Sequence, residues 1–256
     1  LAHAPQQAIR TAPIWSTMER TPLDQMGATC PMPTIEELLA QRISFWHNLT
    51  ATEKQDLVRS ARVARFAASE HVQGAGTGCA GVIFMLSGSL RAYLLDESGK
   101  EVTLFRVGPR ECCVLAASCI MPMITFDIAL DATEPAELIV IDAASFGRVA
   151  QSNVHAEAFT YRQATERFSD CIWVMQQVLF MSFDRRLAVF LSDELARNGQ
   201  TRIAMTHDQI ARHLGTAREV VSRMLKYFEQ EGIVKLGRGS VTVLDRTRLR
   251  GLAASA

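Results

Sequence analysis

The chain has 256 residues, of which 48% are hydrophobic and 21% are charged, and its 27 Lys and Arg balance 27 Asp and Glu. These values are ordinary for a globular protein of one or two domains. No run of about eighteen apolar residues is present, which excludes a membrane-spanning helix. The N-terminal LAHAPQQAIR lacks the pattern of a signal peptide, so the six cysteines indicate a reducing compartment, and we expect a cytoplasmic protein.

The first part of the chain predicts an extension and two short helices. Residues 1–33 are rich in Pro and Ala and form the extension. Thr34 precedes apolar residues at helical spacing, up to Ile43. Thr50 and Glu53 form a capping box, which begins a second helix that we expect to run to about Ala64.

Short strand-like runs dominate from Phe66 to about Phe146. The predicted strands are Gly81–Leu86, Ser89–Leu95, Glu101–Val107, Phe126–Leu130 and Leu138–Asp142. Asp96–Gly99 reads as a hairpin turn, since Gly accepts positive φ. Short strands at this regular spacing predict a β-barrel or β-roll of about eighty residues.

A long helix is predicted between Asn153 and Ser182. Its apolar residues recur at alternating steps of four and three: Val154, Ala158, Tyr161, Phe168, Ile172, Met175 and Leu179, with the polar Thr165 among them. One helix cannot bury such a narrow seam alone, so we expect a homodimer in which Phe168, Ile172, Met175 and Leu179 meet their counterparts. The alternative is that the helix packs on its own β-domain.

The C-terminal part predicts a winged helix-turn-helix. After a helix over Asp184–Ala196, Thr206 and Gln209 form a capping box that opens a short helix, and a second helix begins near Ala217. The second helix turns Val220, Val221, Met224, Leu225 and Phe228 inward and leaves Arg218, Glu219, Ser222 and Arg223 outward. These outward residues are of the types that read bases, although small helix pairs also occur in bundles. Residues 232–236 and 240–244 frame the turn Gly237–Gly239 as a β-wing, and residues 201–256 carry ten Arg or Lys against five Asp or Glu.

The order of these elements, with FMLSGSLRAYLLDESGKEVTLFRVGP in the roll and LGTAREVVSRMLKYFEQEGIV near the C-terminus, resembles the Crp/Fnr family of bacterial transcription regulators. The resemblance implies an α+β fold: a cupin-like β-roll sensor of the cyclic-nucleotide-binding type, a dimerisation helix and a winged helix-turn-helix. We place these parts at residues 34–150, 151–182 and 183–256. The resemblance also implies base contacts by Arg218, Glu219, Ser222 and Arg223. Thr206 and Thr216 suit phosphates, and His207 and His213 are interpreted as neighbours of the DNA backbone.

Cyclic-nucleotide sensing, which the resemblance would suggest, is disfavoured by the residues present. The family's phosphate site begins with Gly-Glu and ends with Arg-Ser or Arg-Thr, but here the matching start is Arg110-Glu111 and no arginine lies between Arg110 and Arg148. A buried phosphate without a cation is costly, and Asp127 would repel it further. We therefore do not expect cAMP as a ligand.

Cysteines stand where that site would be: Cys112, Cys113 and Cys119, with Cys79 upstream. Thiol or persulfide chemistry, with Cys112 and Cys119 as the preferred pair, requires no cofactor. An iron–sulfur cluster on all four cysteines, or haem on His47, His71 or a cysteine, are the alternatives. A purely structural role is also open. In a strand Cys112 and Cys113 would face opposite sides, whereas in a helix Cys112 and Cys119 would share one side. Cys30 and Cys171 are interpreted as incidental.

These observations predict a DNA-binding regulator that is not an enzyme, since we find no nucleophile motif, phosphate loop or paired carboxylates at a fixed spacing. The expected partners are double-stranded DNA and a second copy of the chain, with RNA polymerase as a further candidate and no membrane. A regulator gated by a small organic ligand, and an enzyme or signalling module that borrows the β-roll, are the competing hypotheses. We expect a signal in the roll to shift the long helices and so reorient the recognition helices.

Overall fold

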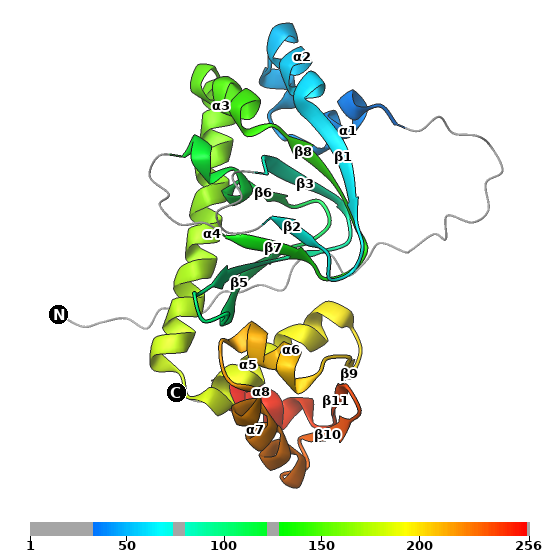
Figure 1. Ribbon diagram of the computed structural model, residues 1–256, viewed down its shortest axis with the longest axis vertical. Coiled ribbons are helices and arrows are strands. Elements are labelled where there is room, and N and C mark those ends of the chain that lie inside the picture. Colours follow the sequence, from blue (N-terminus) through cyan, green and yellow to red (C-terminus); the bar gives the residue numbers. More distant parts are fainter. Residues whose placement is uncertain (1–32, 74–79, 122–127, 255–256) are drawn as a thin grey trace, which may run out of the picture. The chain divides into compact units, whose positions relative to one another are not determined.

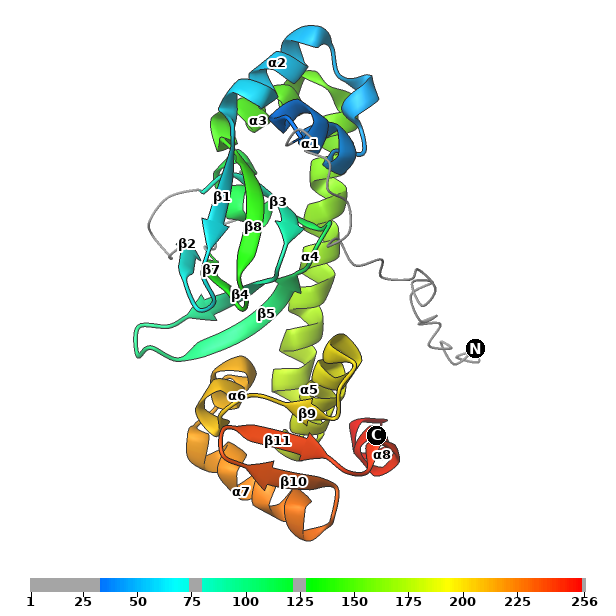
Figure 2. The same cartoon turned by 90° about the vertical axis from the view of Figure 1, so that its right-hand side faces the viewer.

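The computed structural model describes residues 33–73, 80–121 and 128–254. It has the mixed α+β fold that the sequence predicts, in which a β-roll is followed by one long helix and by a helical unit with a small sheet (Figures 1 and 2). The predicted extension lies outside the described residues, except for Pro33. No helix of the described chain is long and apolar enough to cross a membrane.

Two capped helices precede the roll. α1 (Ile35–Arg42) and α2 (Ala51–Ser60) each begin after a threonine whose hydroxyl accepts a backbone N–H, and a glutamate completes each capping box. The prediction that the second helix runs to about Ala64 is wrong, because Ala61–Phe66 form strand β1. This strand pairs antiparallel with Ala136–Ile141 (β8), and the ladder hydrogen bonds outweigh the helix propensity of its sequence.

The roll consists of two antiparallel four-stranded sheets, with strand orders β1-β8-β3-β6 and β2-β7-β4-β5. The predicted strands overlap five of these eight, whereas β1, β2 and β6 were not predicted. Residues 126 and 127 of the fourth predicted strand lie outside the described residues. The strands other than β1 and β8 are β2 (His71–Gln73), β3 (Val82–Ser87), β4 (Leu90–Leu95), β5 (Glu101–Val107), β6 (Cys112–Cys113) and β7 (Ala129–Ala132).

The hairpin of β4 and β5 has the predicted turn. Gly99 has a φ of 81°, and the Asp96 carboxylate accepts the backbone N–H groups of Ser98 and Lys100, each at 2.8 Å. This hairpin matters for function because its second strand, β5, contacts both the long helix and the helical unit that follows.

The long helix α4 (Val154–Phe180) follows α3 (Ala143–Ser152) and lies along the roll (Figures 1 and 2). Ala156 and Thr160 are buried, and the Phe159 ring stacks on Phe84 of β3 with 6.3 Å between centroids. The Arg167 guanidinium lies 4.9 Å from the ring centroid of Phe105 on β5. One side of α4 is therefore attached to the roll of the same chain.

The C-terminal unit has its own apolar core, which includes Leu187, Leu191, Ile210, Leu225 and Phe228. The predicted helix before the helix-turn-helix is present, and it extends to Asn198. A third strand and a last helix, neither of which was predicted, complete the unit. Its elements are α5 (Phe183–Asn198), β9 (Arg202–Ile203), α6 (His207–Leu214), α7 (Arg218–Gln230), β10 (Val234–Gly237), β11 (Ser240–Val243) and α8 (Arg246–Ala254).

Candidate nucleic-acid interface

α6 and α7 form a helix-turn-helix whose turn is fixed by local chemistry. At the start of α6 the Thr206 hydroxyl accepts the Gln209 N–H at 3.2 Å, and the Gln209 side chain accepts the Thr206 N–H at 2.8 Å. Gly215 ends the helix in the left-handed conformation, with φ 62°. The chain then enters α7 at Arg218, as the sequence predicts.

One face of α7 packs against the apolar core of the unit, whereas the polar residues of its first turns are accessible to solvent. Val221, Leu225 and Phe228 are buried. Val220 and Met224, which were also predicted to point inward, are half-buried. Arg218, Glu219 and Arg223 are exposed, while Ser222 is half-buried and lies 2.8 Å from the Nδ1 atom of His207. The arrangement presents donors and acceptors on one end of an anchored helix.

The wing lies beside this helix end. β10 pairs with β11 and β11 pairs with β9, all antiparallel, and Arg238 and Gly239 form the exposed tip. A hollow between the wing and the two helix starts is lined by Thr206, His207, Asp208, Arg218, Gly237 and Gly239. Thr206, which was predicted to contact phosphate, lines this hollow, and its hydroxyl serves the cap of α6. Thr216 is half-buried in the turn.

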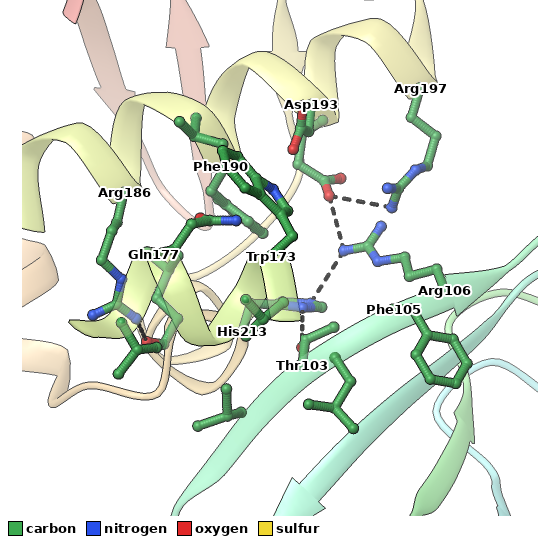
Figure 3. Close-up of a pocket in the computed structure, with 17 residues that line it drawn as sticks. Thr103, Phe105, Arg106, Trp173, Gln177, Arg186, Phe190, Asp193, Arg197 and His213 are labelled. Atoms are coloured by element: carbon green, nitrogen blue, oxygen red, sulfur yellow. Dashed lines mark hydrogen bonds and ion pairs between the residues drawn. The ribbon is translucent and has the colours of Figure 1, made fainter. Parts of the chain in front are cut away.

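A buried polar cluster, here called the joint, attaches the helix-turn-helix to the roll, and Figure 3 draws all of its members except Arg91. Its members are Arg91 of β4, Thr103 and Arg106 of β5, Glu194 of α5 and His213 of α6. The Arg106 guanidinium lies 2.8 Å from the Glu194 carboxylate, and the two side chains are only 13% and 3% exposed. Burial raises the pKa of Glu194 and lowers that of Arg106, and this close contact offsets the cost of both charges.

His213 is held in the joint as a neutral ring. Burial, together with the charges of Arg106 and Arg91, lowers its pKa to about 2. Arginine can only donate, so Nε2 accepts from Arg106 at 3.4 Å, and Nδ1–H donates to the Thr103 hydroxyl at 2.9 Å. The same hydroxyl oxygen accepts from Arg91 at 2.7 Å. The interpretation of His213 as a neighbour of the DNA backbone is therefore wrong, because its ring points to β5.

Beside the joint, the turn that follows α6 packs tightly against β5. A Cβ atom placed on Gly215 would lie 2.4 Å from Cγ2 of Val102, so the absent side chain lets β5 approach the helix-turn-helix. A cavity of about 170 Å³ lies beside this contact and is lined by residues of β5, α4, α5 and α6. The only sign of the joint in the sequence is the presence of Arg106 and His213 inside otherwise amphipathic elements.

The described cysteines of the predicted sensor do not form a common site. Cys112 and Cys113 are successive residues of β6, which pairs with β3, so they face opposite sides. Cys112 is 6% exposed, its thiol donates to the Gln163 side chain of α4 at 3.0 Å, and Cys113 is fully buried. Cys79 and the side chain of Cys119 lie outside what the structure describes. Among the described residues, no three His, Cys, Asp or Glu side chains are placed to hold a metal ion.

Burial also controls the reactivity of these thiols. It raises the pKa of Cys112 to about 12, with a further contribution from Cys113, and it raises the pKa of Cys113 as well. Both groups are therefore protonated thiols at neutral pH, which makes them poor nucleophiles in this arrangement. Cys171 of α4 is half-buried, and burial raises its pKa too.

The apolar seam of α4 is exposed in the single chain. Phe168 is 62% exposed, Met175 49% and Leu179 62%, whereas Ile172 is half-buried. Tyr161, Trp173, Val178 and Phe180 are also exposed on this helix. A run of large apolar side chains of this extent is unusual on a surface that stays in water.

Comparison with known proteins assigns the C-terminal unit to a defined class. Residues 185–252 match the model of the Crp-like helix-turn-helix domain. Over 180 residues the chain is 26% identical to the transcriptional activator protein Anr of Pseudomonas aeruginosa, which covers 67% of this chain and 72% of that protein. Together with the anchored helix α7 and the wing, these matches define a DNA-binding transcription regulator.

Solved structures extend the likeness to the roll. A crystal structure from Eubacterium rectale, assigned to the Crp/Fnr family of transcriptional regulators, is 34% identical with a TM-score of 0.81 and covers 84% of this chain and all of that one. This chain therefore belongs to the Crp/Fnr family. FixK2 of Bradyrhizobium japonicum has the same fold, with a TM-score of 0.61 at 20% identity over 77% of this chain and 98% of that one.

Proposed function

We propose that this regulator is a homodimer that binds an inverted-repeat operator and reads each half-site with Arg218, Glu219, Ser222 and Arg223. The observation that carries the proposal is the contrast along α7, whose apolar back is buried while these polar residues gather on its first turns. An arginine can donate two hydrogen bonds to guanine, and a glutamate can accept from the amino group of cytosine. Thr206 and Thr216, near the hollow and in the turn, are proposed to contact phosphates.

The exposed seam of α4 supports the homodimer. Burying Phe168, Met175 and Leu179 against the same residues of a second copy would remove their apolar surface from water. Two recognition helices related by a twofold axis would then face half-sites about one helical turn apart.

The base-reading assignment is tested by Arg223→Ala. We expect specific binding to the selected operator to weaken about 10- to 100-fold, because a bidentate contact contributes about 1–3 kcal/mol of discrimination, while binding to random DNA falls much less. Arg246→Ala is the control, since it removes the same charge from an exposed position of α8. Equal operator affinity for wild type and Arg223→Ala, measured by fluorescence anisotropy, contradicts the assignment.

We further propose that the signal is sulfur chemistry at Cys112. The support is its position: β6 touches α4 through the Cys112 thiol and Gln163, and Arg167 of α4 donates to the Cys112 carbonyl at 3.4 Å and to the Glu111 carboxylate at 3.1 Å. Hydrogen peroxide would take two electrons from the thiol, giving a sulfenic acid and water. Cys112 is already buried, so the space around its sulfur does not accommodate the added oxygen. Oxidation would therefore push β6 and α4 apart.

This proposal predicts that operator affinity responds slowly to peroxide and only through Cys112. Because the Cys112 thiol is protonated, peroxide should add one oxygen slowly, and operator affinity should change in step with the intact mass. Cys112→Ser should keep the same affinity before and after peroxide, whereas Cys171→Ser, the control on α4, should respond like wild type. A response that survives Cys112→Ser, or visible absorbance from haem or a cluster in anaerobically purified protein, contradicts the proposal.

A further inference from the structure

Ser222 differs from the other proposed base-reading residues because its side chain forms a hydrogen bond with another side chain of the described chain. Its Oγ lies 2.8 Å from Nδ1 of His207, the first residue of α6. Both side chains are half-buried, so water does not freely replace either partner. The contact crosses between the two helices of the motif, at the place where α7 begins to present its polar residues.

The ring of His207 is neutral at neutral pH. Burial lowers its pKa, and the positive charges of Arg218 and Lys226 lower it further. The adjacent carboxylate of Asp208 is paired with Arg212 at 2.8 Å. A neutral imidazole has one N–H donor and one acceptor nitrogen, so it can either accept the serine proton or donate to the serine oxygen.

The second ring nitrogen decides between these two states. Nε2 of His207 has no hydrogen-bond partner within the described chain, and the residue lines the hollow between the wing and the two helix starts, together with Arg218. DNA phosphates offer only acceptors. A phosphate at this hollow therefore holds the proton on Nε2, and Nδ1 must then accept the hydroxyl proton of Ser222.

We propose that His207 is a specificity-determining residue that fixes the hydrogen-bond polarity of Ser222. With its proton engaged by the imidazole, the serine hydroxyl offers only lone pairs to the major groove. Ser222 then selects a base whose exocyclic amino group lies in the major groove, which means adenine or cytosine. Without His207, the hydroxyl can also donate to N7 of either purine, to O6 of guanine or to O4 of thymine. This inference rests on the proposed role of Ser222 at the base edges.

The test is selection of bound duplexes from a library with randomised half-sites, using the full-length protein. Ser222→Ala first identifies the position that Ser222 reads, because the base preference there should disappear. At that position wild type should favour adenine or cytosine over guanine or thymine by about tenfold, the contribution of one well-made hydrogen bond. His155→Ala, an exposed histidine of α4, is the control and should select like wild type.

Two substitutions of His207 then distinguish control of the hydrogen-bond polarity of Ser222 from a purely structural role. His207→Ala should reduce the preference at this position to less than about twofold, because the released hydroxyl both donates and accepts. His207→Arg places a donor-only group beside the serine, so the serine hydroxyl should donate to the base and the preference should shift away from cytosine, toward guanine or thymine. Preferences at the other half-site positions should stay unchanged in both variants.

The outcomes distinguish this inference from the proposed function. If Ser222→Ala alters no position, the base-reading assignment of Ser222 itself is wrong. If Ser222→Ala removes a preference but His207→Ala only lowers affinity uniformly, His207 is structural and the inference is overturned. The inference is equally overturned if wild type and His207→Arg select the same bases, since the wild-type ring would then be a donor to Ser222.

Discussion

At the scale of single residues, two glycines with the same local role have different surroundings. Gly199 ends α5 and Gly215 ends α6, both in the left-handed conformation, with φ of 66° and 62°. A Cβ on Gly199 would meet nothing within 4 Å, whereas one on Gly215 would lie 2.4 Å from Val102 of β5. Local backbone chemistry explains both glycines, but the approach of the roll adds a second constraint at Gly215.

This pair gives a prediction with a built-in control. Gly199→Ala should lower the free energy of unfolding by about 1 kcal/mol, the cost of a left-handed alanine. Gly215→Ala should cost about 1–3 kcal/mol more, because the new methyl group collides with Val102. Denaturant unfolding measures both, and Val102→Ala should restore much of the loss in the Gly215→Ala background. Equal losses for the two glycine variants would show that the contact with β5 is not tight.

The residues also show what a sequence pattern can and cannot reveal. Thr206 and Gln209 were predicted to form a capping box, and they do, because all of its atoms lie within four residues. His213 lies one turn further along the same helix and was misassigned. Its partners, Thr103 and Arg106, are more than a hundred residues away in the chain, so no local rule indicates that the ring is buried against β5.

At the scale of elements, α4 has two different sides. One contacts the roll through residues such as Phe159 and Arg167, and the other exposes the apolar seam. The predicted helix is present, because its apolar period is a local signal, and the structure adds that Asn153 caps its first turn. Of the two alternatives posed by the sequence, packing on the roll is observed for one face of the helix, and packing on a partner stays a prediction for the other.

We predict that Phe168→Asp converts the proposed homodimer to monomers. The substitution places a charge in the middle of the seam and should raise the dissociation constant at least about 30-fold, since losing a central aromatic anchor costs about 2 kcal/mol or more. Sedimentation equilibrium measures the change. Ser169→Asp adds the same charge to the neighbouring exposed residue, off the seam, and should leave the dimer intact. Monomeric wild type, or equal dissociation of both variants, contradicts the assigned interface.

β1 and β6 show why element prediction failed in the roll. Ala61–Phe66 has a sequence suited to a helix, and Cys112–Cys113 is only two residues long. Each becomes a strand because a neighbouring strand supplies the hydrogen bonds, β8 in the first case and β3 in the second. Strand pairing between distant segments leaves no periodic pattern in so short a stretch.

At the scale of the whole molecule, the joint connects the β-roll to the helix-turn-helix unit. It places the buried Arg106–Glu194 pair between β5 and α5, with His213 of α6 beside it. Removing one partner of a buried pair leaves an uncompensated charge, which is the costly change. β5 also carries Phe105, whose ring lies against the Arg167 guanidinium of α4. A movement of the long helix would therefore displace β5 and change the contacts of the joint.

We predict that Arg106→Ala lowers the free energy of unfolding by about 3–5 kcal/mol, whereas the double variant Arg106→Met with Glu194→Leu recovers most of the loss. Arg248→Ala is the matched control. Its partner Glu231 lies 2.9 Å away, but these side chains are 50% and 43% exposed, so the loss should be about 1 kcal/mol or less. If Arg106→Ala costs no more than Arg248→Ala, the pair does not hold the joint together.

The sequence by itself determined the class of protein. The caps, helical periods and polar residues of the helix-turn-helix are local features, so the pattern that reads DNA, the long helix and the presence of a β-roll could all be predicted. The tertiary structure decided which groups meet across the chain. Burial made Cys112 and Cys113 protonated thiols on opposite faces, His213 a neutral member of the joint, and His207 a partner of Ser222. Charge state and hydrogen-bond polarity depend on these distant neighbours and on exclusion of water, which a linear pattern does not encode.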